Sequence, residues 1–256
     1  RPDLRPALVA GARSQLESPN ALAQEQALAL LAGIEYREAA ATIAPMLNHR
    51  QPAVRRAAVI ALRQLDARAQ GPQLLARATT VAELWQQQMQ EIRQQAEAGR
   101  VERRAPDHWI DAELAELLQA LGVLQHEPAR ALLLKILPKD SRWSPAVRAA
   151  AAWSLGKLFQ DTGEEGVSRL LLGRVLDVLS ATPEDDTVRR YAALAVGMIR
   201  AGNAAEGLER GMRIDEQGAP QIAAIRWALE HVTGQPLPPP APVVDVRRGW
   251  FLEPHR

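Results

Sequence analysis

The chain has 256 residues, 47% of them hydrophobic but only 4% aromatic, and its 31 basic and 30 acidic residues leave a net charge of +1. So even a balance does not favour a protein that binds nucleic acid or an anionic membrane along a broad basic surface. The absence of cysteine excludes disulfides, thiolate metal sites and a catalytic thiol.

No apolar run approaches the roughly 20 residues needed to cross a bilayer, and the chain opens with neither an initiator methionine nor a signal peptide. We therefore expect a soluble protein that is cytoplasmic or exported after processing, and the given chain to be a processed form or a piece of a longer one. The sequence does not determine the compartment.

In chain order, a short helix is predicted around residues 4–16, where it would cover one end of the structure. A repeated pattern follows. Residues 51–65 read QPAVRRAAVIALRQL, residues 144–158 read SPAVRAAAAWSLGKL, and residues 186–199 read DTVRRYAALAVGMI. Apolar residues recur in each copy at steps of three and four, as the buried stripe of a helix requires. Weaker copies share the rhythm.

One apolar position of this pattern gives the period of the repeat. It is occupied by Leu31, Leu62, Leu121, Leu155, Val196 and Leu229. Four of the five intervals are 31 to 41 residues, and the fifth, of 59 residues, contains an insertion. Partner helices and short turns rich in Gly, Asn, Asp and Pro separate the copies. The predicted fold is all-α: a right-handed α-solenoid of about six helical hairpins over residues 1–234.

The pattern P-x-V-R-x-A-A-x-x-x-L resembles HEAT repeats, specifically the short bacterial type of phycobilisome-lyase-like proteins. The resemblance implies that the arginine after the valine reaches an acidic residue of an adjacent turn or repeat, forming a polar ladder. Arg55, Arg148 and Arg189 occupy that position, and Asp140 and Asp185 are the expected acidic partners. The other copies lack the arginine, so the expected ladder is partial.

The resemblance also implies that the helices carrying this motif line the concave side of the solenoid. Arg56, Arg63 and Arg190 lie on those helices, where a basic groove could hold an acidic peptide or helix of another protein. An ordinary solvated face is the alternative interpretation.

Residues 79–106 form the insertion, and their apolar spacing predicts an amphipathic helix that ends near Gly99. Two interpretations stay open. The helix either lengthens a repeat helix packed on its neighbour, or it presents Trp85 and Met89 to a partner.

Residues 235–256 form a proline-rich tail that cannot be helical. It carries a basic pair, Arg247 and Arg248, followed by the bulky residues Trp250 and Phe251. The tail is expected either to cover the open end of the solenoid or to dock on a partner.

No motif predicts chemistry. One HEAT-repeat hydroxylase family binds di-iron through several His-Glu dipeptides, but here His126 and Glu127 form the only one and lie in a predicted turn before Pro128. Neither a zinc-binding nor a nucleotide-binding motif is present, nor a nucleophile elbow. We therefore predict no catalytic, cofactor-binding or metal-binding residues. Trp153 and Trp227 share a repeat position with Ile60 and Leu194, which favours packing over a base-stacking platform.

The sequence therefore predicts a non-catalytic scaffold or adaptor, a subunit of a larger complex, that binds another protein through its concave face, inserted helix or tail. A lyase-like or chromophore-handling protein is the first alternative, and it rests on the repeat resemblance alone. A nucleic-acid-processing HEAT protein is the second, which the near-neutral charge disfavours.

Overall fold

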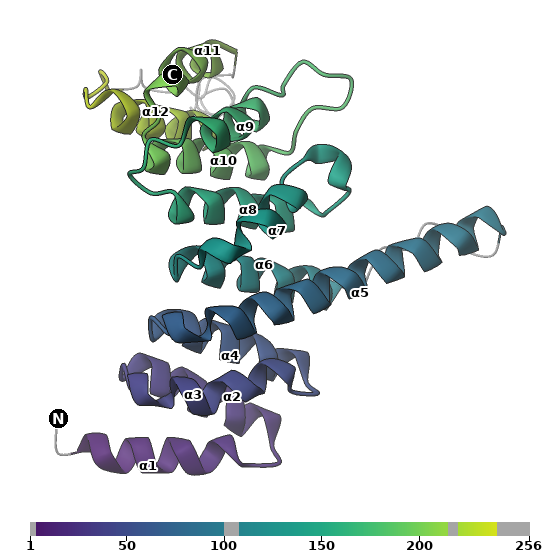
Figure 1. The fold of residues 1–256 in the computed structure, drawn as a ribbon, viewed down its shortest axis with the longest axis vertical. Coiled ribbons are helices and arrows are strands. Elements are labelled where there is room, and N and C mark those ends of the chain that lie inside the picture. Colours follow the sequence, from purple (N-terminus) through teal and green to yellow (C-terminus); the bar gives the residue numbers. More distant parts are fainter. Residues whose placement is uncertain (1–3, 100–107, 215–219, 240–256) are drawn as a thin grey trace, which may run out of the picture.

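The computed structural model describes residues 4–99, 108–214 and 220–239, and within them the chain is helical without strands. The helices form two rows that stack along one axis, with α1 at one end of the stack and α11 and α12 at the other (Figure 1). The predicted all-α solenoid of helical hairpins is confirmed.

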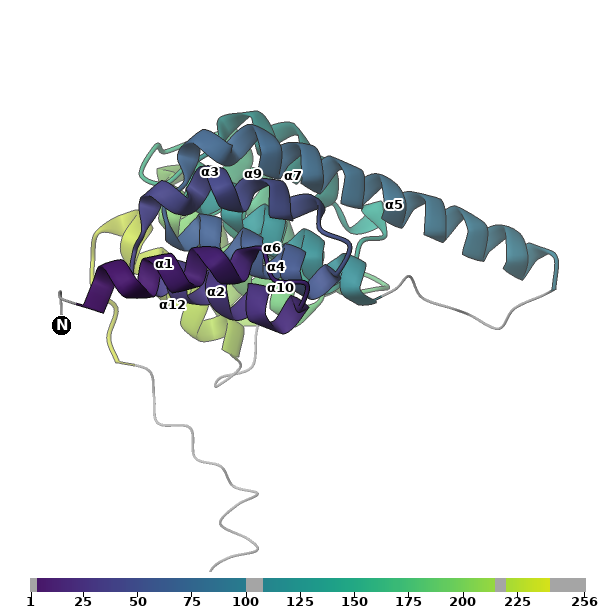
Figure 2. The ribbon, with the colours of Figure 1, turned by 90° about the horizontal axis from the view of Figure 1, so that it is seen from below.

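The even row consists of α2 (Ala21–Gly33), α4 (Pro52–Gln64), α6 (His108–Val123), α8 (Pro145–Leu158), α10 (Asp186–Ile199) and α12 (Pro220–Thr233). Each member contacts the next in that order. The odd row consists of α3 (Ala40–Ile43), α5 (Gly71–Glu97), α7 (Arg130–Ile136), α9 (Glu165–Val175) and α11 (Ala205–Ile214). Seen along the stack, α3, α5, α7 and α9 lie on one side of the even row (Figure 2). The additional helix α1 (Arg5–Leu16) packs on α2.

The apolar position that gave the repeat its period is buried in every copy. Its side chain is 0% exposed in α2, α4, α6, α8 and α10 and 4% exposed in α12. The starts of these helices follow from local chemistry. Proline stands in the first turn of α4 and α8, where its missing N–H costs no hydrogen bond. The side chains of Asn20, Ser144 and Asp185 accept hydrogen bonds from the first turns of α2, α8 and α10.

Glycines allow the later helices of the even row to approach closely. A Cβ atom on Gly122 of α6 would lie 2.7 Å from the Cα atom of Ser154 in α8. A Cβ atom added to Gly156 of α8 would lie 2.5 Å from the Cα atom of Ala195 in α10. A Cβ atom added to Gly197 of α10 would lie 2.7 Å from the Cα atom of Ala228 in α12. Because these glycines directly follow the buried apolar position in their copies, close contact is a repeated feature of the joints from α6 to α12.

The joint between α4 and α6 is polar instead. Arg63 of α4 occupies the position that glycine holds in α6, α8 and α10. Its guanidinium donates to Glu116 at 3.1 Å and to Gln119 at 3.0 Å, both on α6. A long side chain therefore fills the space that is closed by backbone contact in the later joints.

The predicted inserted helix is the second half of α5, which runs without a break through 27 residues. Its first half lies in the odd row, and its second half projects well beyond the stack in both views (Figures 1 and 2). The last buried residue of the helix is Trp85. The helix ends at Glu97, close to the predicted end, and residues 100–107 lie outside the described part of the chain.

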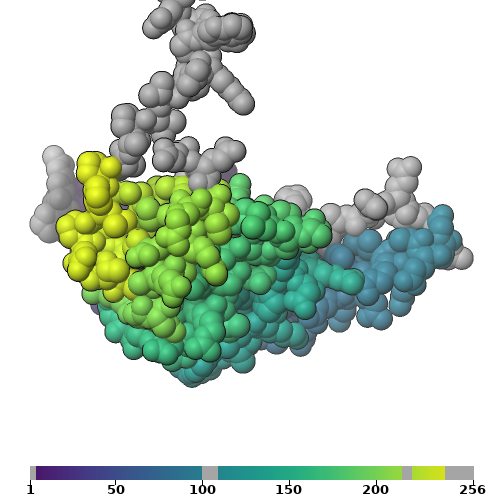
Figure 3. Space-filling model, turned by 90° about the horizontal axis from the view of Figure 1, so that it is seen from above, coloured from purple at the N-terminus to yellow at the C-terminus, as the bar shows by residue number. Residues whose placement is uncertain are grey.

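The two ends of the stack differ. At the first end, α1 buries only Ala12 and Leu16. At the other end, residues 235–239 fold back on α12: the N–H of Leu237 donates to Glu230 at 3.1 Å, and Arg226 donates to the carbonyl oxygen of Pro238. Figure 3 looks onto this end, with α12 in yellow and the α5 projection in blue reaching to the side. The described start of the tail therefore lies on α12. Arg247, Arg248, Trp250 and Phe251 are outside the described residues.

Candidate interaction surfaces

Each helix of the even row has one stripe that reaches solvent. We call these stripes together the even-helix face. Its principal residues are Arg56, Ile60 and Arg63 on α4, Glu116 and Gln119 on α6, Trp153 and Lys157 on α8, Arg190, Tyr191 and Leu194 on α10, and Trp227 on α12. All of them are half-buried. The face exists because the repeat places its buried residues three and four apart, which leaves the remaining side of each helix in contact with water.

Trp153 is the largest side chain on the α8 part of this face. Residues 147–152 and 154–156 of α8 are buried, so Trp153 is the one half-buried side chain within residues 147–156. The ammonium of Lys157, one turn further along, lies 5.7 Å from the centre of the Trp153 ring. Such a cation–π contact holds the ring and the charge together at the surface.

The neighbouring helices continue the face. On α10, the guanidinium of Arg190 lies 5.1 Å from the centre of the Tyr191 ring. Leu194 and Trp227 pack against the buried core, whereas Trp153 and Ile60 stand outside it. Trp227 also stacks on His231 with the ring centres 3.9 Å apart. The repeat position that Trp153 occupies is thus a packing position in α10 and α12 and a surface position in α8.

The α4 and α6 part of the face is charge-balanced. Arg63 is paired with Glu116 at 3.1 Å. Arg56 is half-buried, and its Nε atom has no hydrogen-bond partner in the structure. These two predicted partner-binding arginines therefore lie on the face, but Arg63 is already held by a carboxylate.

The expected arginine ladder consists of two buried clusters. Arg55 donates through Nε and Nη2 to Glu113 of α6, at 2.6 to 3.0 Å, and Arg77 of α5 donates to the same carboxylate. The guanidinium of Arg55 also donates to the carbonyl oxygen of His49 at 2.9 Å. Glu113 is completely buried. The carboxylate of Glu113 thus links both α4 and α5 to α6 of the next repeat.

The second cluster repeats this arrangement. Arg148 of α8 reaches both carboxylate oxygens of Glu184 at 2.6 Å, and Arg174 of α9 lies 3.6 Å from the same group. The acidic partners are therefore Glu113 and Glu184. The expectation that Asp140 and Asp185 would serve was wrong: Asp185 caps α10 through the N–H of Thr187, and Asp140 has no contact with Arg148 in the structure. Sequence reasoning missed both glutamates because each is 36 or more residues from its arginine.

Arg189 occupies the same repeat position in α10. It donates to the carbonyl oxygen of Val175 at 3.0 Å and to Asp186, three residues earlier, at 3.2 Å. Gln221 of α12 donates to the same Asp186 carboxylate at 3.4 Å. Arg189 and Gln221 therefore share the carboxylate of Asp186, which links α10 to α12.

Trp85 lies inside the protein. Its ring is 6% exposed and stacks on Trp143, with the ring centres 4.0 Å apart and the planes at 25°. Trp143 directly precedes the capping residue of α8, so the stack fastens α5 to a later repeat. This burial argues against the expectation that Trp85 is presented to a partner. Met89, one turn further, is half-buried and packs against the core, so the projecting part of α5 begins beyond it.

The described part of the chain contains no group of three or more His, Asp or Glu side chains that could hold a metal ion. His126 lies against Gly71 at the start of α5, and His231 pairs with the carbonyl oxygen of Trp227 at 2.7 Å. In the same part of the chain, no helix combines the length and apolar character of a bilayer span.

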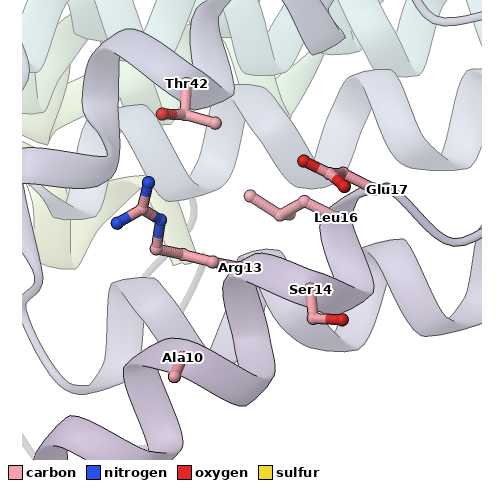
Figure 4. A pocket seen from close by; sticks show the side chains of 6 residues that line it. All are labelled: Ala10, Arg13, Ser14, Leu16, Glu17 and Thr42. Atoms are coloured by element: carbon pink, nitrogen blue, oxygen red, sulfur yellow. The ribbon is translucent and has the colours of Figure 1, made fainter.

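Two open furrows are formed by described residues near α3. One of about 330 Å³ lies between α1 and α3 and is lined by Ala10, Arg13, Ser14, Leu16, Glu17 and Thr42 (Figure 4). Another, of about 520 Å³, lies where α3 and the turn after it face α5.

The fold and these surfaces define the class of protein. Residues 9–94 match the family model for HEAT repeats. This part of the chain matches HEAT repeats, the described helices form an α-solenoid of HEAT-like hairpins, and the resemblance drawn from the sequence is confirmed.

Among solved structures, the chain is similar to a chain in the complex of CpcE and CpcF of phycocyanin lyase from Nostoc sp. PCC7120. The two chains are 20% identical, the match covers 88% of this chain and 82% of that one, and the TM-score is 0.51. At this identity the similarity concerns the fold. No curated protein sequence matches the chain.

Proposed function

We propose that the protein is a non-catalytic scaffold that binds another protein through the even-helix face of α8 and α10. The observation that carries the proposal is the half-buried indole of Trp153, which stands outside the core on the exposed stripe of α8. Partly exposed tryptophan and arginine side chains are the residues most enriched among the energetic centres of protein interfaces.

The surroundings of Trp153 support this role. Lys157 lies over its ring, and Leu194, Tyr191 and Arg190 occupy the same face of the next helix. Because the glycine contacts between α8 and α10 fix the two helices closely together, the face is rigid and preorganised for binding. The similar solved chain works in a complex of two proteins, which also supports a protein partner.

Other partner-binding candidates remain predictions of the same proposal. Arg56 and Arg63 extend the face towards the first repeats, and Met89 lies at the base of the α5 projection. The tail residues Arg247, Arg248, Trp250 and Phe251 would provide a separate contact if the tail docks on a partner.

The experiment is affinity capture from an extract of the source organism, with identification of the captured proteins by mass spectrometry. Three baits are compared: the wild type, Trp153→Ala and the matched control Leu170→Ala. Leu170 is 54% exposed on α9, away from the even-helix face. A partner retained by the wild type and Leu170→Ala but lost by Trp153→Ala is expected. Equal capture by all three baits would contradict the proposal.

A lyase-like role is the rival function, and the only observation that favours it is the similarity in fold to the phycocyanin lyase complex. It predicts that the protein retains a free bilin chromophore, or attaches one to a thiol of an acceptor protein. Gel filtration with absorbance detection of the bilin would reveal either event, and the scaffold proposal expects neither.

A further inference from the structure

We propose that the partner segment held by this face is an acidic amphipathic helix. Its apolar side would lie on Trp153 and Leu194, and its carboxylates would face Lys157 and Arg190. This inference rests on the proposed function and specifies the chemistry of its ligand.

The charge of the face is the first argument. Lys157 and Arg190 lie over aromatic rings, and neither forms an ion pair with a carboxylate of the described residues. Helix α8 contains no aspartate or glutamate. The carboxylates four residues from each cation along the chain are engaged: Asp161 is paired with Arg200, and Asp186 accepts from Arg189 and Gln221. The face therefore presents uncompensated positive charge beside an indole.

The contrast with other arginines of the same helices sharpens this argument. Arg55 and Arg148, one turn or less from the exposed stripe, are each held by a fully buried glutamate. The chain thus neutralises its inward-facing cations and leaves Lys157 and Arg190 on the surface without an acid. Carboxylates on the partner would complete the arrangement.

The helical form of the partner segment follows from the need of its backbone N–H and C=O groups for hydrogen-bond partners. The part of the even-helix face on α8 and α10 consists of the Trp153 and Tyr191 rings, Leu194 and the cations Lys157 and Arg190. An extended peptide would bring unpaired N–H and C=O groups against this surface, whereas a helix satisfies them internally.

The spacing of the apolar anchors also fits a helix. Packed helices lie about 8–10 Å apart, and seven residues of a helix span about 10.5 Å. A helix that runs along the stack would therefore place residues i and i+7 over Trp153 of α8 and Leu194 of α10. Residues i+3 and i+4 would fill the surface between them.

Two other occupants fit less well. The chain's own tail carries the basic pair Arg247 and Arg248, which would face Lys157 and Arg190 with like charge. A nucleic-acid strand carries a phosphate at every nucleotide, whereas α8 and α10 offer only these two cations on the face, beside an apolar surface.

The test is selection of a phage-displayed library of 18-residue helices on the full chain, with the surface positions of the helix randomised. Enriched peptides are synthesised with a fluorescent label, and their affinities are measured by anisotropy for the wild type and four variants. The two face variants are Trp153→Ala and the double variant Lys157→Glu/Arg190→Glu. Their matched controls are Leu170→Ala and Arg169→Glu/Arg210→Glu, which change exposed residues of α9 and α11. Circular dichroism and urea unfolding verify that each variant is folded.

We expect enriched peptides with an i, i+3/i+4, i+7 apolar stripe and flanking Asp or Glu. Each face variant should weaken their binding by at least about tenfold, the controls by less than twofold, and added salt should weaken it further. Enrichment of basic or non-helical peptides that still depend on Trp153 would overturn this inference and leave the proposed function standing. If no enriched peptide depends on Trp153, this inference fails, and the capture experiment with the Trp153→Ala bait decides the proposed function. Binding of a 20-nucleotide single strand that depends on Trp153 would also overturn both.

Discussion

Arg55 of α4 and Glu113 of α6 form a buried ion pair that is closed by two guanidinium nitrogens, the shorter contact being 2.6 Å between Nη2 and Oε2. The pair joins two repeats across 58 residues of chain, and Arg77 adds a second cation to the same carboxylate. The equivalent cluster of Arg148, Arg174 and Glu184 joins α8, α9 and the segment before α10. These clusters supply specific polar links between repeats that otherwise pack mainly through buried apolar side chains.

The first prediction concerns the second cluster. Arg148→Ala should lower the free energy of unfolding by about 3 kcal/mol, because it leaves the fully buried Glu184 with the more distant Arg174 as its remaining cation. Arg68→Ala is the control, since Arg68 and its partner Asp66 are 59% and 43% exposed and such pairs contribute about 0–1 kcal/mol. Urea unfolding measures both. Equal losses in the two variants would refute a stabilising role for the cluster.

The second prediction concerns the close helix contacts. Gly156→Ala places a methyl group against the backbone of Ala195, so α8 and α10 must separate, at a cost of about 1–3 kcal/mol. Gly173→Ala in α9 is the matched control: nothing lies within 4 Å of its added Cβ atom. Alanine is the better helix former, so this control should be stabilised by up to about 1 kcal/mol. Thermal unfolding distinguishes the two. A stabilised Gly156→Ala variant would show that the contact can relax without cost.

The third prediction separates packing from partner binding at α5. Trp85→Ala removes a buried ring and its stack on Trp143, so it should cost about 3–5 kcal/mol. It should also speed hydrogen exchange along residues 74–85. Met89→Ala, at a half-buried position, should cost less than about 1.5 kcal/mol. A Trp85→Ala protein of wild-type stability would restore the interpretation that this ring serves a partner.

The fourth prediction concerns the start of the tail. Deleting residues 235–256 removes the contacts of Leu237 and Pro238 with α12 and should lower the melting temperature by a few degrees, at about 2–4 °C per kcal/mol for a chain of this size. Deleting residues 243–256 alone leaves those contacts in place and should have the smaller effect. Equal melting temperatures of the two truncated proteins would show that residues 243–256, and not residues 235–242, stabilise the end of the solenoid.

How much of the fold was predictable is clearest at the repeated helices. The apolar period located every member of the even row, and Pro52 and Pro145 marked the starts of α4 and α8. These features are local: a helix that buries one stripe needs apolar residues every three or four positions, whatever it packs against. The HEAT resemblance followed from the same residues.

The candidate site was only partly predictable. The repeat register placed Arg56, Arg63 and Arg190 on one face, and all three are half-buried on helices of the even row. The register also aligned Trp153 with Ile60, Leu194 and Trp227, but it could not distinguish the half-buried ring that stands outside the core from those that pack against it. That difference depends on what the neighbouring helices bring to the same place.

By itself, the sequence determined the helices, their period and the stacking of similar hairpins, because these depend on spacing along one chain segment. Only the tertiary structure decided that Arg55 meets Glu113, that Trp85 stacks on Trp143, and that Gly156 touches Ala195. Each of these contacts joins residues far apart in the chain. They are fixed by the register and distance at which one helix packs on another, which no single segment encodes.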